Sequence, residues 1–167
     1  KQMCVSMTYE ASSTPRYFSG HVIRMGYVTS AARQAVYHAV LRPWLWLLNY
    51  TNDCQIFQNT KINDLVKTEF FTAGPFEDKL DASVYKQREY VVQYRESDFN
   101  FVSRLMEEEG IFYYFKHTDN KHTMVLCDSK SGMTQFADAI EYLPGRKETY
   151  VRDAISDWHG AKEVETE

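Results

Sequence analysis

The chain has 167 residues, a mass of 19.6 kDa and a formal net charge of −4. Its 44% hydrophobic and 25% charged content is typical of a folded chain with one domain or two small ones, which excludes wholesale disorder. The acidic balance excludes nucleic acid as the main partner, because phosphate binding needs a basic footprint, and no stretch reaches the roughly 20 apolar residues of a membrane span.

Aromatic residues make up 15% of the chain, with 12 Tyr and 10 Phe. Tyr and Phe favour half-buried strands and are enriched at subunit interfaces, so the composition predicts a β-rich fold, an extensive interface, or both.

The three cysteines, Cys4, Cys54 and Cys127, are an odd number at wide spacings. This pattern indicates reduced thiols in a cytoplasmic protein rather than a disulfide framework.

Three segments of the first third of the chain are predicted to be strands: residues 1–9, 16–29 and 34–42. Gly20 and Gly26 are candidate bend or bulge points in the second of them. The third ends at Pro43. The apolar run Trp44 to Leu48 that follows is either a short turn of helix or the end of a buried strand.

The middle of the chain combines a helical pattern with a strand pattern. Apolar residues follow helical spacing from Ile62 to Phe70, with Asn59 or Thr60 as the predicted N-cap. Residues 71–83 are interpreted as a connector to a strand over residues 88–95. In that strand Tyr90, Val92 and Tyr94 alternate with Val91, Gln93 and Arg95, which is typical of a half-buried strand.

A capped amphipathic helix is predicted next, beginning at Ser97 or Asp98. Its apolar arc consists of Phe99, Phe101, Val102, Leu105 and Met106. Gly110 supplies the left-handed residue that ends it. Residues 111–117 and 122–128 then flank a polar four-residue connection, Thr118-Asp119-Asn120-Lys121, suited to a hairpin.

The last part of the chain is less regular. After Ser129 the sequence is polar and loop-like through Gly145, and residues 149–158 are predicted to open another strand pair.

The segment YVVQYRESDFNFVSRLMEEEGIFYYF, followed by KHTMVLCDS, resembles the central region of VgrG, the spike protein of bacterial type VI secretion systems. That family is similar to the hub proteins of contractile phage tails. Two upstream segments agree with the resemblance, RYFSGHVIRMGYV (16–28) and LRPWLWLLNYTNDCQIFQN (41–59). The resemblance covers roughly residues 16–129.

The resemblance implies an α+β fold, in which an antiparallel β-barrel of the phage tail hub type carries an inserted strand–helix–hairpin module. Residues 1–50 would form part of the first hub barrel, residues 51–130 the inserted α+β module, and residues 131–167 a connector and the start of a second hub barrel. Because the chain begins without Met and stops in a charged run, we expect it to be a fragment of a longer protein.

The same resemblance implies a structural role without catalysis, cofactor or metal. Its expected partners are two further copies in a homotrimer, the hexameric Hcp tube protein, and spike-tip and effector proteins. If each subunit carries two similar barrels, a trimer presents six units to a six-fold ring, using closed cyclic symmetry. The implied localisation is assembly in the cytoplasm followed by injection through the type VI system.

Glu107, Glu108 and Glu109 are the obvious candidates for carboxylate chemistry. A glycoside hydrolase needs two carboxyl groups that face each other across a cleft, whereas consecutive residues on a helix point about 100° apart. We therefore predict roles in pairing and assembly. Arg104 can pair with Glu107 or Glu108 at a spacing of three or four residues, and Glu109, inside the apolar arc, is expected to reach a backbone N–H or a basic partner.

Two other residue pairs invite functional interpretations. His117 and His122 are predicted to face each other at the hairpin neck, near Asp119 and Cys127, but they lack a CxxC or HExxH spacing, so closing the turn is favoured over metal binding. The remaining histidines, His21, His38 and His159, are isolated in the sequence and are given no role.

Trp44 and Trp46 would form an aromatic platform for a sugar or a partner if they lay on a strand. Core filling beneath the helix at residues 62–70 is the favoured interpretation. Three rival functions remain open: a phage or prophage tail baseplate hub, a glycoside hydrolase that uses the glutamates, and a carbohydrate-binding module that uses the tryptophans.

Overall fold

The structure is a computed structural model that describes residues 1–9, 12–31, 34–133, 140–143, 154–155 and 157–160. The chain divides into two compact units: Lys1–Met7 with Arg16–Met133, and Thr8–Pro15 with Thr134–Glu167. The proposed division at residues 50 and 130 stays a prediction. Within the described residues, no helix has the length and apolar character needed to cross a bilayer.

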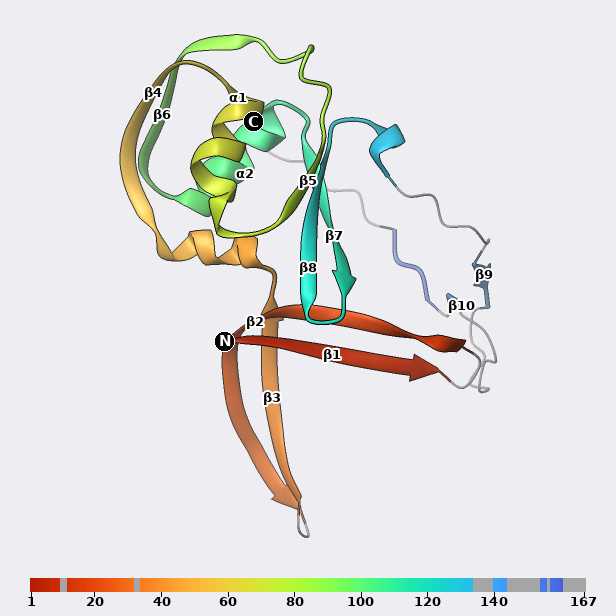
Figure 1. The fold of residues 1–167 in the computed structure, drawn as a ribbon. Coiled ribbons are helices and arrows are strands. Elements are labelled where there is room, and N and C mark those ends of the chain that lie inside the picture. The colour runs from red at the N-terminus through yellow and green to blue at the C-terminus, as the bar shows by residue number, and fades with distance from the viewer. Residues whose placement is uncertain (10–11, 32–33, 134–139, 144–153, 156, 161–167) are drawn as a thin grey trace. The chain divides into compact units, whose positions relative to one another are not determined.

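Strands dominate the described residues, and short helices lie between them (Figure 1). The strands are β1 (Gln2–Tyr9), β2 (Ser12–Ala31), β3 (Gln34–Arg42), β4 (Asn52–Lys61), β5 (Phe76–Lys79), β6 (Gln87–Ser97), β7 (Phe112–Thr118), β8 (Lys121–Cys127), β9 (Glu141–Tyr142) and β10 (Ala154–Ile155). The helices are η1 (Trp44–Tyr50), α1 (Ile62–Leu65), η2 (Val66–Phe70), η3 (Phe71–Ala73), α2 (Asp98–Glu108) and η4 (Lys130–Gly132).

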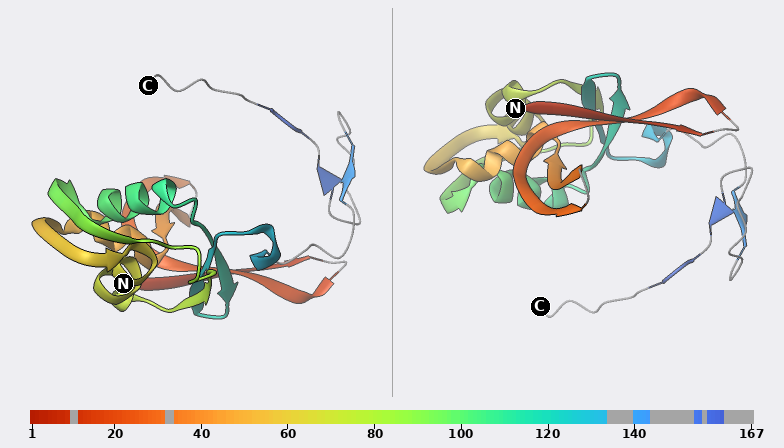
Figure 2. Two further views of the ribbon diagram at one scale, coloured as in Figure 1. Left: turned by 90° about the horizontal axis from the view of Figure 1, so that it is seen from above. Right: turned by 90° about the horizontal axis from the view of Figure 1, so that it is seen from below.

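The first three strands form one sheet in the order β1-β2-β3. The far half of β2 pairs antiparallel with β3, from His21 opposite Arg42 to Ala31 opposite Gln34. Figure 2 shows β2 bending on the way to this half. Gly20 immediately precedes His21, and a Cβ atom at Gly20 would come within 2.9 Å of the Arg42 carbonyl oxygen. The described strands form open sheets rather than a closed barrel, so the barrel stays a prediction.

Of the two alternatives predicted for Gly26, a bend or a bulge, the bulge is wrong. Gly26 pairs regularly with His38, and the two register shifts lie between Val22 and Arg24 and between Tyr27 and Thr29. A bulge needs one extra residue rather than a glycine, so the glycine alone did not locate it.

The ribbon of β4 and β6 is the second sheet, and it curves around α1 and α2 (Figure 1). The strands run antiparallel, with Ile56 opposite Val92 and Phe57 opposite Val91. The predicted alternation of β6 is present, but its inner face carries Val91 and Gln93, which are both buried. Tyr90, Val92 and Tyr94 lie on the exposed face instead.

The predicted helix over residues 62–70 consists of one α-helical turn, α1, continued by the π-helical turn η2. The predicted caps are wrong. Lys61 occupies the N-cap position without a side-chain hydrogen bond. Asn59 lies in β4 with a φ of 51°, a left-handed conformation that Asn tolerates better than most residues. The strand therefore continues through both predicted caps, and packing of the apolar face holds the helix.

Helix α2 has the termini that its sequence specifies. The Ser97 side chain accepts a hydrogen bond from the Asn100 backbone N–H at 3.2 Å, which satisfies one of the free donors of the first turn. At the other end, Gly110 has a φ of 71° and donates to the Glu107 carbonyl, while the Ile111 N–H donates to the Met106 carbonyl at 2.8 Å. These two bonds form a Schellman motif, which fixes where the chain leaves the helix.

The third sheet has the order β5-β8-β7. The hairpin of β7 and β8 was predicted, but its loop is shorter than expected, because Thr118 pairs with Lys121 and leaves only Asp119 and Asn120 between the strands. Strand β5 pairs parallel to β8 and was interpreted as part of a connector. Its sequence, FEDK, has one apolar residue, so an edge strand of this length leaves almost no hydrophobic pattern.

A short parallel pair, β9 with β10, lies in the C-terminal part of the chain. It includes two residues of the predicted strand pair at 149–158. Residues 149–153 and 156 of that prediction lie outside the described residues. The loop-like segment expected after Ser129 includes η4 and β9, and its residues 134–139 and 144–145 also lie outside them.

The hydrophobic core lies between the β4–β6 ribbon, the helices and the β5-β8-β7 sheet. Its fully buried members are Trp44, Ile62, Val66, Phe71, Phe101, Val102, Leu105, Met106, Met124 and Leu126. Phe57 stacks on Phe101 with ring centroids 5.8 Å apart, and Phe70 is tilted against Phe101 at 5.4 Å. Aromatic packing therefore ties β4 of the ribbon to η2 and α2.

Candidate functional site

The apolar arc of α2 supplies structure rather than an accessible site. Phe101, Leu105 and Met106 are fully buried in the core. Phe99 is half-buried at the edge of the core, with its ring 5.8 Å from that of Trp46. Phe101, Leu105 and Met106 are therefore unavailable to an outside partner, and the role of the arc in assembly stays a prediction.

The three glutamates at the end of α2 have different surroundings. Arg88 on β6 donates to Glu108 Oε2 at 2.6 Å and to Glu109 Oε1 at 2.5 Å. Arg104 donates to Glu108 Oε1 at 3.3 Å and to Glu96 Oε1 at 2.6 Å. Glu107 is exposed and forms no ion pair within the described residues. Two of the three acids are thus held by arginines of their own chain, which join α2 to β6.

This network is poorly suited to acid catalysis. The hydrogen bond from Arg88, with help from Arg104, holds the pKa of Glu108 below its usual value. A glycosidase acid needs a raised pKa so that it carries a proton near neutral pH. Glu108 is therefore ionised where such an acid must be protonated. The arginines stabilise the charge, and they also compensate the unfavourable placement of acids at a helix C-terminus.

The tryptophan platform is wrong, because Trp44 and Trp46 lie on the 3₁₀-helix η1 and not on a strand. Residues two apart on such a helix point in different directions. Trp44 is buried, with its ring 5.6 Å from Phe71 and its Nε1 donating to the Pro75 carbonyl at 3.2 Å. Trp46 is half-buried under the Arg42 guanidinium, 4.8 Å from the ring centroid. The two rings share no face.

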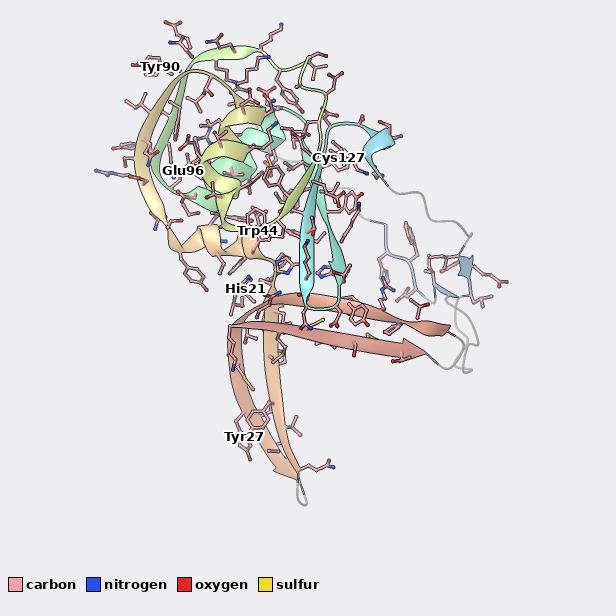
Figure 3. The ribbon with its side chains drawn as sticks, in the orientation of Figure 1. His21, Tyr27, Trp44, Tyr90, Glu96 and Cys127 are labelled. Carbon is pink, nitrogen blue, oxygen red and sulfur yellow. The ribbon has the colours of Figure 1, made fainter. Side chains whose placement is uncertain are left out.

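His117 and His122 do lie opposite each other in the hairpin, with ring centroids 6.1 Å apart. His21, which was treated as isolated, lies against His122 at 5.8 Å. We call these three residues the histidine cluster. Within the described residues, no group of three potential ligands is arranged to hold a metal ion. The cluster connects β2 to the β7–β8 hairpin, and His21 is labelled in Figure 3.

The exposed face of the β4–β6 ribbon is a surface that the sequence did not reveal. We call it the outer face; it consists of Cys54, Ile56, Gln58, Tyr90, Val92 and Tyr94. Its four large apolar residues are 44–65% exposed, and the guanidinium of Arg95 lies over the ring of Tyr94, 5.2 Å from its centroid. Tyr90 is labelled on the outer side of the ribbon in Figure 3. The alternation of β6 indicated two faces, but apolar residues on both of them concealed which one is buried.

The β1-β2-β3 sheet exposes a second set of apolar side chains. Its members are Met3, Val5, Met7, Phe18, Met25, Tyr27, Val28, Val36 and Tyr37. Val36 and Tyr37 are consecutive paired residues on β3, so they point to opposite sides of the sheet. The sheet is therefore exposed on both faces in this chain. Exposed apolar side chains in this number are typical of an interaction site.

The whole chain, residues 1–167, matches the phage tail baseplate hub (GPD) family. Among curated proteins it is 46% identical over 158 residues to the type VI secretion system spike protein VgrG1c of Pseudomonas aeruginosa, a match that covers 90% of this chain and 21% of that protein. It is 41% identical over 172 residues to VgrG1a of the same species, covering 99% of this chain and 26% of that protein. The chain thus spans about a quarter or less of these relatives.

A solved structure has a similar fold, with a TM-score of 0.66 and 26% sequence identity. It is the E. coli c3393 protein, described as a component of the type VI secretion system with structural similarity to the T4 bacteriophage tail proteins gp27 and gp5. The match covers 84% of this chain and 39% of that one. The sequence comparison and the structure comparison therefore agree that this chain is similar to components of type VI secretion systems.

Proposed function

The chain belongs to the phage tail baseplate hub family, and from this premise we propose that it forms part of the hub of a type VI secretion spike. In this proposal three copies of the full-length protein surround one axis and dock on the hexameric Hcp tube, and spike-tip and effector proteins associate with the assembled spike. The role is structural and non-enzymatic. The spike assembles in the cytoplasm and is then injected with its cargo.

The observation that carries this proposal is the combination of the family match with the exposed apolar surface. The match extends over the whole chain, while both faces of the β1-β2-β3 sheet and the outer face of the β4–β6 ribbon display large apolar side chains. An isolated soluble domain rarely leaves so much apolar surface uncovered. Open sheet edges add to the argument, because unpaired strands invite further pairing. A hub subunit covers such surfaces with the rest of its chain and with neighbouring copies.

The relatives favour secretion over the rival phage hub. The curated relatives that match at 41–46% identity are type VI spike proteins, and the structural neighbour is a component of the same system. The similarity of this chain to phage proteins is at the level of the family as a whole, which is that of phage tail baseplate hubs.

The decisive experiment measures the mass of the full-length protein by multi-angle light scattering at micromolar concentration. We expect three times the mass of the chain, because a hub of this kind closes a three-fold ring. For this 167-residue portion alone we expect a mixture of monomer and weak assembly. A strictly monomeric full-length protein would contradict the proposal.

A further inference from the structure

The histidine cluster connects segments that lie far apart in the sequence. The Nε2 atom of His122 on β8 accepts a hydrogen bond from the Trp44 backbone N–H at 2.9 Å. The Nδ1 atom of His117 on β7 accepts one from the Ser19 backbone N–H at 3.1 Å. Trp44 opens η1, directly after β3 and Pro43, and Ser19 lies on β2. Two imidazoles therefore bind the hairpin to the segments that lead into and out of the β2–β3 pair.

The direction of these hydrogen bonds fixes the chemistry of His122. A backbone N–H can only donate, so the Nε2 atom must offer a lone pair and the neutral ring must carry its proton on Nδ1. That Nδ1 atom is buried and has no hydrogen-bond partner among the residues that the structure describes. Protonation of the ring would add a hydrogen to Nε2, and this N–H would point at the Trp44 N–H, so the hydrogen bond between them would be lost. It would also leave a buried charge without compensation, which is costly.

The surroundings of His122 give a charged ring no support. The titratable groups that contact it are His21 from β2 and His117 from β7. Strand β3 adds Arg42, which lies opposite His21 in the register, and η1 contributes the Trp44 backbone. None of these groups is an acid. Burial, followed by the two neighbouring imidazoles, lowers the pKa of His122 below its usual value.

We propose that His122 is a pH-sensitive latch: its neutral ring fastens the start of η1 to the β7–β8 hairpin, and protonation releases this connection. The latch would make the attachment of the β2–β3 pair over residues 16–42 to the β7–β8 hairpin weaker in acid. This inference does not depend on the proposed function, since it rests on contacts within one chain.

The sign of the effect follows from the lowered pKa. The unfolded chain binds a proton at His122 at a higher pH than the folded chain does, so the stabilisation is complete above the unfolded value of about 6.5. It decreases as the pH falls from there toward the lower value of the folded state. Acid, not base, opens the latch.

Amide hydrogen exchange followed by NMR tests the latch on the whole chain, with the Leu105 amide in the core as an internal reference. As the pH is lowered from about 7.5 until the ring protons of His122 have titrated, the protection factor of the Trp44 amide relative to that of Leu105 should fall about fivefold or more, as expected when one hydrogen bond is lost. In His122→Gln, whose amide oxygen can accept the same bond but cannot titrate, the ratio should stay constant. His38→Gln on β3, which removes an exposed histidine, should behave like the unmodified protein.

Three results would overturn the inference. The ratio could stay constant in the unmodified protein, it could fall equally in His122→Gln, or Trp44 and Leu105 could lose protection together, which would indicate global unfolding. If His122→Gln does not fold, the ring protons of His122 in the unmodified protein provide the test. Their titration must coincide with the loss of Trp44 protection, and a titration without loss of protection, or a loss without titration, refutes the latch.

Discussion

At the scale of single residues, Leu105 is the clearest test of the packing of α2. Its side chain is fully buried among the aromatic residues of the core. Leu105→Ala should lower the free energy of unfolding by about 2–5 kcal/mol, because it removes buried apolar surface and leaves a cavity. Urea unfolding followed by circular dichroism measures this. Glu107→Ala, on the exposed side of the same helix, is the matched control and should cost much less. A loss below about 0.5 kcal/mol in Leu105→Ala would contradict the burial.

Arg88 is the residue that makes the contribution of the glutamate network to stability depend on pH. It hydrogen-bonds Glu108 and Glu109, and its bond to Glu108 is the main cause of the lowered pKa of that carboxyl. A lowered carboxyl pKa gives stability that is present above the unfolded value of about 4.3 and lost as the pH falls through the folded value. Arg88→Gln should therefore lower stability at neutral pH and flatten its acid dependence.

The size of the Arg88 effect should be small, because partly exposed ion pairs contribute about 0.2–1 kcal/mol each and are screened by salt. Urea titrations at several pH values, repeated at high ionic strength, measure both properties. Lys86→Gln, an exposed lysine two residues earlier, is the control. An unchanged acid profile in Arg88→Gln would show that the network contributes nothing to stability.

At the scale of elements, the N-terminus of α2 depends on one side chain. Ser97 is the only residue whose hydroxyl caps this helix within the described residues, through the hydrogen bond to the Asn100 N–H. Ser97→Ala should cost about 1 kcal/mol of unfolding free energy, while Ser97→Asp, which keeps an acceptor beside the helix dipole, should cost less. Thermal unfolding of both variants measures the difference. Equal losses in the two variants would mean that the hydroxyl acts through packing and not as a cap.

The elements that could be predicted are those with strong local signals. Helix α2 has a capping serine, an apolar arc and a C-terminal glycine, and all three act as the sequence indicates. Strand β5 and the caps of α1 were missed because their positions are decided by pairing with β8 and by the continuation of β4. The burial of Gln93 instead of Tyr94 depends on which face of the ribbon meets the helices. No local pattern contains that information.

The part of the candidate site that could not be predicted from the sequence depends on contacts between segments that are far apart in the chain. Arg88 and the glutamates are 20 and 21 residues apart, and His21 reaches His122 across the fold. The acids and the hairpin histidines could be selected from the sequence, since each lies on a predicted element. Their partners could not be selected from the sequence, because only the fold brings β2 next to the hairpin histidines and β6 next to the acids. A pair of acids or histidines seen in the sequence can therefore be given a function only when the residues that contact it in the fold are known.

At the scale of the whole molecule, the glutamate cluster distinguishes a structural hub from an enzyme. Changing Glu107, Glu108 and Glu109 together to Gln keeps their size and removes their charge. Because Arg88 and Arg104 of the same chain already hold Glu108 and Glu109, the full-length protein should keep its oligomeric mass and become only modestly less stable. It should have no hydrolytic turnover to lose, since Glu108 is ionised and consecutive helical carboxyls diverge.

Light scattering and a reducing-sugar assay on peptidoglycan and chitin-type substrates measure these two outcomes. Hydrolysis by the unmodified protein, abolished in the triple variant, would refute the structural role. A loss of oligomeric mass with intact folding would instead indicate that Glu107, the acid without an ion pair among the described residues, pairs with a basic group of a neighbouring copy. Glu107→Gln alone would then reproduce the loss, whereas the pair of changes at Glu108 and Glu109 would not. The three carboxylates can thus be separated into two that hold α2 on β6 and one that faces outward.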